Sequence, residues 1–295
     1  MTEWESLSSR GGLACHDIVG WMMWDERAKA SFAELGMPNP NAWVVAWRLA
    51  ALGDTPHPVV ASMTYSISPA IIELVTDTVR SLMTAEQVLE ALDDAVVPGL
   101  ESIAPGLSAD LAPLADDLWR GVDSVFAGMR PMFAAHRARP RPADRDPALS
   151  AWHALNCIRE LRGDNHWALL AAADIDDVQA GLLHSAMIDV DEYGDEEWIA
   201  RSRGGDDAAV SAAWTMLEAR GWAEDGRLSE AGRRFRLDLE RRTDALTAPV
   251  WQAIGEATTT RVVELIEPHH EAFVARIDAT AGPRWMPAVR GVEPV

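Results

Sequence analysis

Hydrophobic residues recur every three to four positions along most of this chain, which is the spacing that places them on one face of an α-helix. Pro and Gly interrupt the pattern, and Pro often stands first in a new segment, where its missing N–H costs little. The pattern predicts an all-α fold of two helical domains or halves with a minimal β element. The expected helices span 13–35, 41–52, 58–66, 69–82, 84–97, 108–135, 148–172, 174–187, 206–220, 229–246, 249–266 and 268–278.

The clearest boundary is the segment 137–147, which holds three prolines and four arginines. Prolines this dense favour an extended tether over a helix. We therefore predict an N-terminal helical domain over 1–136, a linker over 137–147 and a C-terminal helical domain over 148–295. Within the latter, 189–197 is expected to be an acidic loop.

Charge and composition narrow the possible partners. The 295 residues include 46 acids and 26 bases, a formal net charge of −20. The negative electrostatic field of such a chain repels phosphate groups, so we do not expect binding to nucleic acid or to anionic membrane surfaces. No run approaches the roughly 18 apolar residues of a membrane helix, and 1–12 lacks a secretory signal pattern, so we expect a cytoplasmic protein without membrane contact. Thirteen Trp predict an aromatic-lined core, a pocket or both.

The segment 152–167 concentrates the reactive side chains of the chain. At 100° per residue, one helix face carries His153, Cys157, Glu160 and Asp164. His and Cys four apart can chelate a metal, but no second His or Cys pair has ligand spacing, so we predict no metal site. Gly163 before Asp164 is expected to break the helix, with the carboxylate capping the segment that follows.

A second face of the same helix carries Arg159, Arg162 and His166. Two guanidinium groups about one turn apart, followed by an imidazole, suit a carboxylate or a phosphate. The alternative is internal pairing, in which the two arginines bond Glu160, Asp164 or an acid of another helix.

Residues 206–246 resemble the C-terminal part of winged-helix regulators of the multiple-antibiotic-resistance type. The resemblance rests on Met216–Trp222 at the end of a recognition helix, on Glu224–Leu228 as a short wing and on the helix start Leu228–Arg233. It implies a helix-turn-helix fold. The expected recognition helix begins with two Asp residues and has only Arg220 as a base, which is a poor match to phosphates. The arginines that follow, Arg233, Arg234, Arg236, Arg241 and Arg242, alternate with acids and are expected to form a solvated helix face.

The central segment also resembles a group of actinobacterial helix-turn-helix-containing proteins with an Arg-Gly-Asp-x-His signature. Here the signature is Trp152-His153-Ala154 followed by Ile158-Arg159-Glu160-Leu161-Arg162-Gly163-Asp164-Asn165-His166. Two first-half stretches of the group appear in altered form, as Ala46–Gly53, which contains Arg48, and as Thr64–Pro69, which contains Tyr65. The resemblance implies a fold and the place of a site, and it carries over no reaction or ligand.

These observations lead to a first hypothesis of non-catalytic binding or sensing of a small anionic, partly aromatic or apolar ligand in a Trp-rich pocket. The ligand would be a metabolite or a tetrapyrrole, haem on His166 or His153 being a narrower version; the cofactor, if any, is unknown. The candidate ligand-binding residues are Arg48, Tyr65, His153, Arg159, Arg162, Asp164 and His166.

Two alternatives stay open. One is a winged-helix transcription regulator that acts as a homodimer. The other is an enzyme that uses His166 as general acid or base, oriented by Asp164. The chain contains no nucleophile elbow, phosphate loop or zinc-protease motif, so no catalytic residue is predicted.

Overall fold

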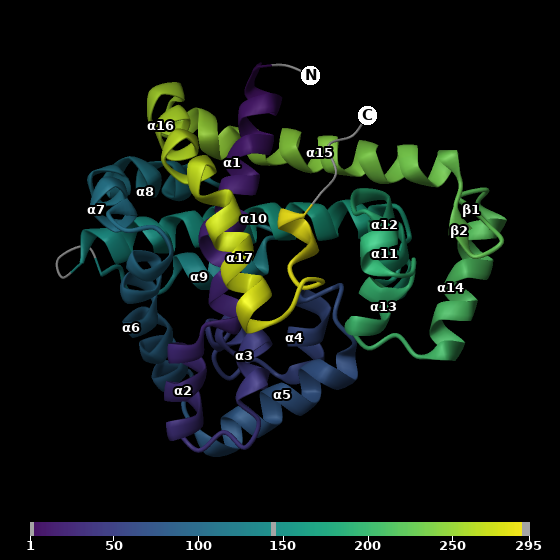
Figure 1. Ribbon diagram of the computed structural model, residues 1–295, viewed down its shortest axis with the longest axis horizontal. Helices are drawn as coiled ribbons and strands as arrows, with labels where there is room; N and C mark the ends of the chain where they lie inside the picture. The colour runs from purple at the N-terminus through teal and green to yellow at the C-terminus, as the bar shows by residue number, and fades with distance from the viewer. Residues whose placement is uncertain (1–2, 143–145, 291–295) are drawn as a thin grey trace.

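The computed structural model describes residues 3–142 and 146–290 (Figure 1). In these residues helices dominate, and one two-stranded antiparallel hairpin supplies the strands, which confirms the all-α fold with a minimal β element. The elements are α1 (Glu3–Gly20), η1 (Trp21–Trp24), α2 (Glu26–Glu34), α3 (Trp43–Ala50), α4 (His57–Met63), α5 (Pro69–Leu82), α6 (Ala85–Ile103), α7 (Leu107–Leu111), α8 (Ala115–Ser124), α9 (Pro131–Arg137), α10 (Pro147–Ala172), α11 (Asp177–Leu183), η4 (His184–Met187), α12 (Val190–Tyr193), α13 (Trp198–Ser202), α14 (Asp207–Ala219), β1 (Ala223–Glu224), β2 (Arg227–Leu228), α15 (Glu230–Ile254), α16 (Glu256–Ile266) and α17 (His270–Thr280).

Local signals set several helix starts as expected. Pro69 begins α5, and Thr84 forms a capping box with Gln87 at the start of α6: its hydroxyl accepts from the Gln87 N–H at 3.2 Å, and the Gln87 side chain accepts from the Thr84 N–H at 2.8 Å. Asp146 caps α10 without a capping box: its carboxylate accepts from the Ala148 and Leu149 N–H groups, each at 3.0 Å.

Two long predicted helices are interrupted in the structure. The helix expected over 13–35 starts earlier, at Glu3, and ends at Gly20, because Asp25 accepts a hydrogen bond from the Ala28 N–H and so starts a separate helix. The helix expected over 108–135 is divided into α7, α8 and α9.

Three predicted helix breaks are wrong. The helix α10 continues through Gly163 and Asp164 to Ala172, and the Asp164 carboxylate accepts from Phe133 of α9 instead of capping its own chain. Pro98 and Pro249 lie inside α6 and α15, each followed by buried apolar residues that hold the helix in place. The helix α15 ends at Ile254, and Gly255, whose φ of +98° suits glycine, divides the helix expected over 249–266 between α15 and α16.

The expected acidic loop 189–197 contains the one-turn helix α12, and the short helix α13 that follows was not predicted. Both are too short to show a helical period in the sequence.

Buried side chains form two main hydrophobic clusters. The larger one draws on α1, α3, α6, α8, α10 and α15–α17. The other combines the last turns of α10 with α11, α13, α14, the hairpin and the first half of α15. The helices α10 and α15, which pack against each other and cross the molecule in Figure 1, therefore belong to both clusters.

The division into domains at 137–147 stays a prediction, and residues 143–145 of that segment lie outside the described residues. Arg137 ends α9 and Pro147 begins α10, and the larger cluster contains side chains from both sides of the segment. Within 3–142 and 146–290, no helix is long and apolar enough to cross a membrane.

Candidate functional site

A cavity of about 1700 Å³ lies where α1, α3, α10, η4, α13 and α15 meet. Its wall combines basic side chains with tryptophans and methionines. The residues that matter for its chemistry are His16, Met23, Trp24, Arg48, Arg159, Arg162, His166, Trp167, His184, Trp198, Arg203, Arg236, Glu240, Asp244, Trp285 and Met286.

One ion-pair network forms the α3–α10 side of the cavity. Arg48 binds the fully buried Glu160 through two hydrogen bonds of 2.9 and 2.6 Å, and Arg159 donates a third of 2.8 Å. Burial alone would raise the pKa of Glu160, but the two guanidinium groups lower it to about 2. The Nε of Arg159 is buried without a hydrogen-bond partner.

A second network joins α10 to α15. Arg162 is paired with Glu240 and with Asp244, whose Oδ1 accepts from its Nη2 at 3.0 Å. Arg236 forms an ion pair with Glu240 on the same helix and is only 2% exposed, so the expectation of a solvated face is wrong for this arginine. Its neighbours follow the expectation: Arg234 pairs with Glu230 at the exposed surface.

Three imidazoles face the cavity without a strong acidic partner. The Nδ1 of His166 lies 3.2 Å from the Thr243 hydroxyl and 3.8 Å from Glu240. Burial lowers the pKa of His166 to about 3, and it also lowers the pKa values of His16 and His184. All three rings are therefore neutral near pH 7 and can donate or accept hydrogen bonds.

Arg203 is the guanidinium that the two networks leave out. It follows α13 directly, and its backbone carbonyl accepts from the Ser68 N–H at 2.9 Å. Among the described residues, its side chain makes no hydrogen bond or ion pair. Burial, followed by the charges of Arg236 and Arg48, lowers the pKa of Arg203 to about 10, so it remains a cation at neutral pH.

The tryptophans form an apolar part of the wall. Trp285 contacts Trp24 at 5.6 Å and Trp198 at 5.2 Å between ring centroids. The Arg48 guanidinium lies over the Trp167 ring, and the distance of 5.6 Å from its Cζ to the ring centroid allows a cation–π interaction.

The structure thus brings four of the seven predicted site residues to the cavity: Arg48, Arg159, Arg162 and His166. The other three lie elsewhere. Tyr65 donates its hydroxyl hydrogen to the Ile175 carbonyl, and His153 pairs with Asp93 at 2.8 Å. The Asp164 carboxylate accepts from the Phe133 N–H at 2.8 Å and does not orient His166.

Sequence reasoning missed His16, His184, Arg203 and Arg236. They come from four separate segments that only the tertiary fold brings together, so no local spacing marks them. The one available signal was that Arg236 stands four residues before Glu240, and that spacing is equally common on exposed helices.

Next to the cavity, α11, α13, α14 and the hairpin pack together at the end of the molecule where α15 begins (Figure 1), and α14 with the hairpin forms most of the segment 206–246 for which a winged helix was predicted. Asp225 and Gly226 connect the two strands with φ of +50° and +69°, as a tight hairpin turn requires. Gly181 allows α11 to approach α13, since a Cβ at this position would lie 2.6 Å from the Ala200 Cα.

The exposed face of α14 carries no basic residue. It presents Asp207, Ala208, Ser211, Ala212, Thr215, Met216, Glu218 and Ala219. Arg220, at its end, donates to the carbonyls of Ala173 and Asp174.

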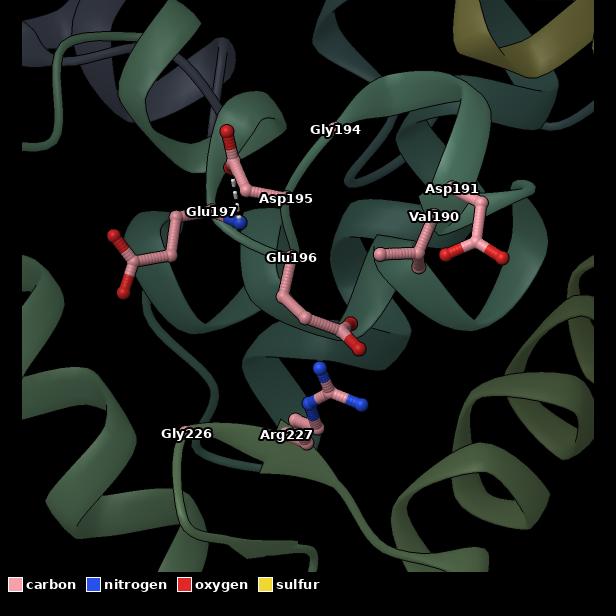
Figure 2. Close-up of a pocket in the computed structure, with 8 residues that line it drawn as sticks. All are labelled: Val190, Asp191, Gly194, Asp195, Glu196, Glu197, Gly226 and Arg227. Carbon is pink, nitrogen blue, oxygen red and sulfur yellow. Dashed lines mark hydrogen bonds between the residues drawn. The ribbon is translucent and has the colours of Figure 1, made fainter.

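A smaller pocket of about 360 Å³ separates the acidic segment from the hairpin (Figure 2). The Glu196 carboxylate and the Arg227 guanidinium point toward one another in this view. Glu196 also lies 3.9 Å from Arg233 of α15. The acidic segment therefore faces Arg227 of the hairpin and Arg233 of α15, and Arg227 remains exposed.

Comparison with known proteins gives one family. A family model described as a helix-turn-helix family matches residues 10–280. No curated protein and no solved structure matches the chain. Because the match covers most of the chain, including the helices that build the cavity and α14 with the hairpin, the protein belongs to this helix-turn-helix family.

Proposed function

We propose that the protein binds a small anionic ligand with a partly aromatic or apolar body and performs no chemistry on it. The observation that carries this proposal is one cavity in which arginines from α3, α10 and α15 face tryptophans from η1, α13 and the segment after α17. Binding sites of this kind combine an apolar wall with a few convergent polar groups.

The geometry gives less support to catalysis. His166, the candidate acid or base, hydrogen-bonds a hydroxyl and has a pKa far below neutrality, so it is a weak base at pH 7. The enzyme alternative relied on Asp164 to orient this imidazole, and the structure places that carboxylate against α9.

A thermal-shift screen with aromatic carboxylates and phosphates tests the proposal. A ligand at one hundred times its Kd stabilises a protein by about 2.7 kcal/mol, which raises Tm by several degrees. We expect such shifts in the wild type and a smaller shift in Trp285→Ala, which removes part of the apolar wall. Arg120→Ala, outside the cavity, is the matched control. If no compound changes Tm, or if both variants respond equally, the proposal is wrong.

The family match favours a second candidate function, a DNA-binding regulator of the winged-helix type. The recognition position would be α14, and a homodimer would present two copies of it. Against this, the exposed face of α14 lacks bases, and Glu196 of the acidic segment places a negative charge beside Arg233 and opposite Arg227. Measured affinity for duplex DNA at about 50 mM salt decides between the two, since phosphate contacts are strongest there. No binding at tens of micromolar protein would exclude this candidate.

A further inference from the structure

The charges that line the cavity do not balance. We call inner wall the part of the lining that carries five guanidinium groups, those of Arg48, Arg159, Arg162, Arg203 and Arg236. Three carboxylates pair with them, those of Glu160, Glu240 and Asp244. The bases at the rim are paired separately, as in the ion pair of Arg10 with Glu267 and that of Arg241 with Asp238. Glu5, which also lines the cavity, lies near enough to Arg241 of the rim to raise the pKa of that arginine. The five inner guanidinium groups therefore exceed the three carboxylates paired with them by two charges. Uncompensated charge in a partly buried site is costly, so this surplus indicates a ligand with two negative charges.

One of the two surplus charges is that of Arg203, and the other belongs to the pair Arg48 and Arg159. Arg48 and Arg159 share Glu160, while Arg162 and Arg236 share Glu240 with additional help from Asp244. Arg203 is the member of the set without a carboxylate among the described residues. A guanidinium group presents two parallel N–H donors, which match the two oxygens of a carboxylate or a phosphate.

Neutral donors adjoin this arginine. His184 follows α11 and His166 projects from α10, and both rings lie close enough to Arg203 and Arg236 for these charges to affect their titration. Among the described residues, the His184 ring makes no hydrogen bond. Two orphaned groups, the Arg159 Nε and the His16 Nδ1, are also buried near the same wall.

The apolar part of the cavity wall indicates the chemical character of the rest of the ligand. The Trp24–Trp285–Trp198 cluster offers ring faces and edges to a flat group. The cavity volume of about 1700 Å³ exceeds that of a typical small-molecule site, so a headgroup and an extended body fit together.

We infer that the cavity takes an amphiphile whose doubly charged headgroup, a phosphate monoester or a dicarboxylate, binds Arg203 with His166 and His184, and whose aromatic body lies against Trp24, Trp198 and Trp285. This inference rests on the proposed function and adds the ligand class to it. It also makes Arg203, which follows α13 and precedes α14, a direct ligand contact.

Binding of four probes to the full chain at pH 8 tests the inference. The probes are 1-naphthyl phosphate, 1-naphthylmalonate, 1-naphthoate and 1-naphthol, which share one ring system and carry two, two, one and no negative charges. Calorimetry or quenching of Trp fluorescence gives the Kd values. We expect at least one dianion to bind about tenfold or more tightly than 1-naphthoate, and the better dianion identifies the headgroup.

The matched variants are Arg203→Gln and Arg201→Gln, two residues apart. Arg201 is exposed and pairs with Glu197 and Asp207, outside the cavity. We expect Arg203→Gln to weaken the dianion about tenfold and to leave 1-naphthoate within threefold, while Arg201→Gln changes neither. Circular dichroism and Tm establish that each variant folds. If Arg203→Gln does not fold, Arg203→Lys serves, with a smaller selective loss because it keeps the charge but not the fork.

The failures are distinguishable. Equal binding of dianions and 1-naphthoate, or equal dianion affinity in the Arg203 variant and the wild type, overturns the inference and leaves the proposed function intact. Absence of binding by all four probes at 1 mM contradicts the proposed function, and the inference with it.

Discussion

At the scale of single residues, the cavity depends on acids that hold arginines in place. Glu160 accepts three hydrogen bonds from Arg48 and Arg159 and is completely buried. Both guanidinium groups would be left without their carboxylate if this side chain lost its charge.

We expect Glu160→Gln to lower the free energy of unfolding by about 3–5 kcal/mol, because breaking a buried ion pair leaves uncompensated buried charge. The control is Glu230→Gln, which breaks the exposed pair with Arg234 and should cost less than about 1 kcal/mol. Urea denaturation at pH 7 measures both. Equal effects of the two substitutions would show that Glu160 contributes no more than a surface acid.

Asp164 gives a pH-dependent prediction. Burial raises its pKa to about 7, against hydrogen bonds from α9, and its Oδ1 has no partner. Since the folded-state pKa lies above the unfolded value, the contribution to stability is complete below about pH 4 and is lost as pH rises to about 7. Asp164→Asn should therefore be more stable than the wild type at pH 8 by about 1–3 kcal/mol relative to their difference at pH 4. Identical pH profiles of unfolding would contradict the assignment. The charged groups that face Asp164 and share the profile are Glu160 and Arg48.

At the scale of elements, two glycines have opposite roles that the sequence does not distinguish. Gly181 lies where α11 touches α13, whereas a Cβ at Gly163 would meet no atom within 4 Å beyond its own helix. The first permits a close contact between helices, and the second only weakens α10.

Gly181→Ala should destabilise the protein by about 1–3 kcal/mol because α13 must shift. Gly163→Ala should stabilise it by about 0.5–1 kcal/mol through helix propensity. Thermal unfolding of the two variants checks both signs. A neutral Gly181→Ala would mean that the contact of α11 with α13 is loose.

The sequence predicted the starts of helices that have a long hydrophobic face and begin at Pro or a capping residue, as in α5, α6 and α10. It failed where tertiary packing decides: Pro249 stays inside α15 because Val250 and Trp251 are buried, and α13 has too few residues to show a period. The site follows the same division. Four of the seven predicted site residues line the cavity, but Arg203 and His184 could not be predicted from local spacing. Their role depends on distant segments meeting in space.

At the scale of the whole molecule, two hydrophobic clusters share α10 and α15. Because each of these helices contributes buried residues to both clusters, unfolding of one cluster removes packing partners from the other.

We therefore expect a single cooperative unfolding transition. Far-UV circular dichroism and Trp fluorescence should give the same midpoint in urea, and the same midpoint should follow when the probe is Trp214 alone, in the second cluster. Two separated transitions would show instead that the halves of the chain unfold independently, as a division at 137–147 would allow.

The length of α15 has a mechanical consequence. Its 25 residues form an unbroken rod of about 37 Å, held by Val250 and Trp251 at one end and carrying the hairpin at the other. Glu240 and Asp244, which face the cavity, lie between these two points. Because Leu239 of α15 also packs in the second cluster, a tilt of about 5° around the Val250–Trp251 end would carry the hairpin and that cluster together by about 2–3 Å. A small event inside the molecule would in this way be magnified at its edge.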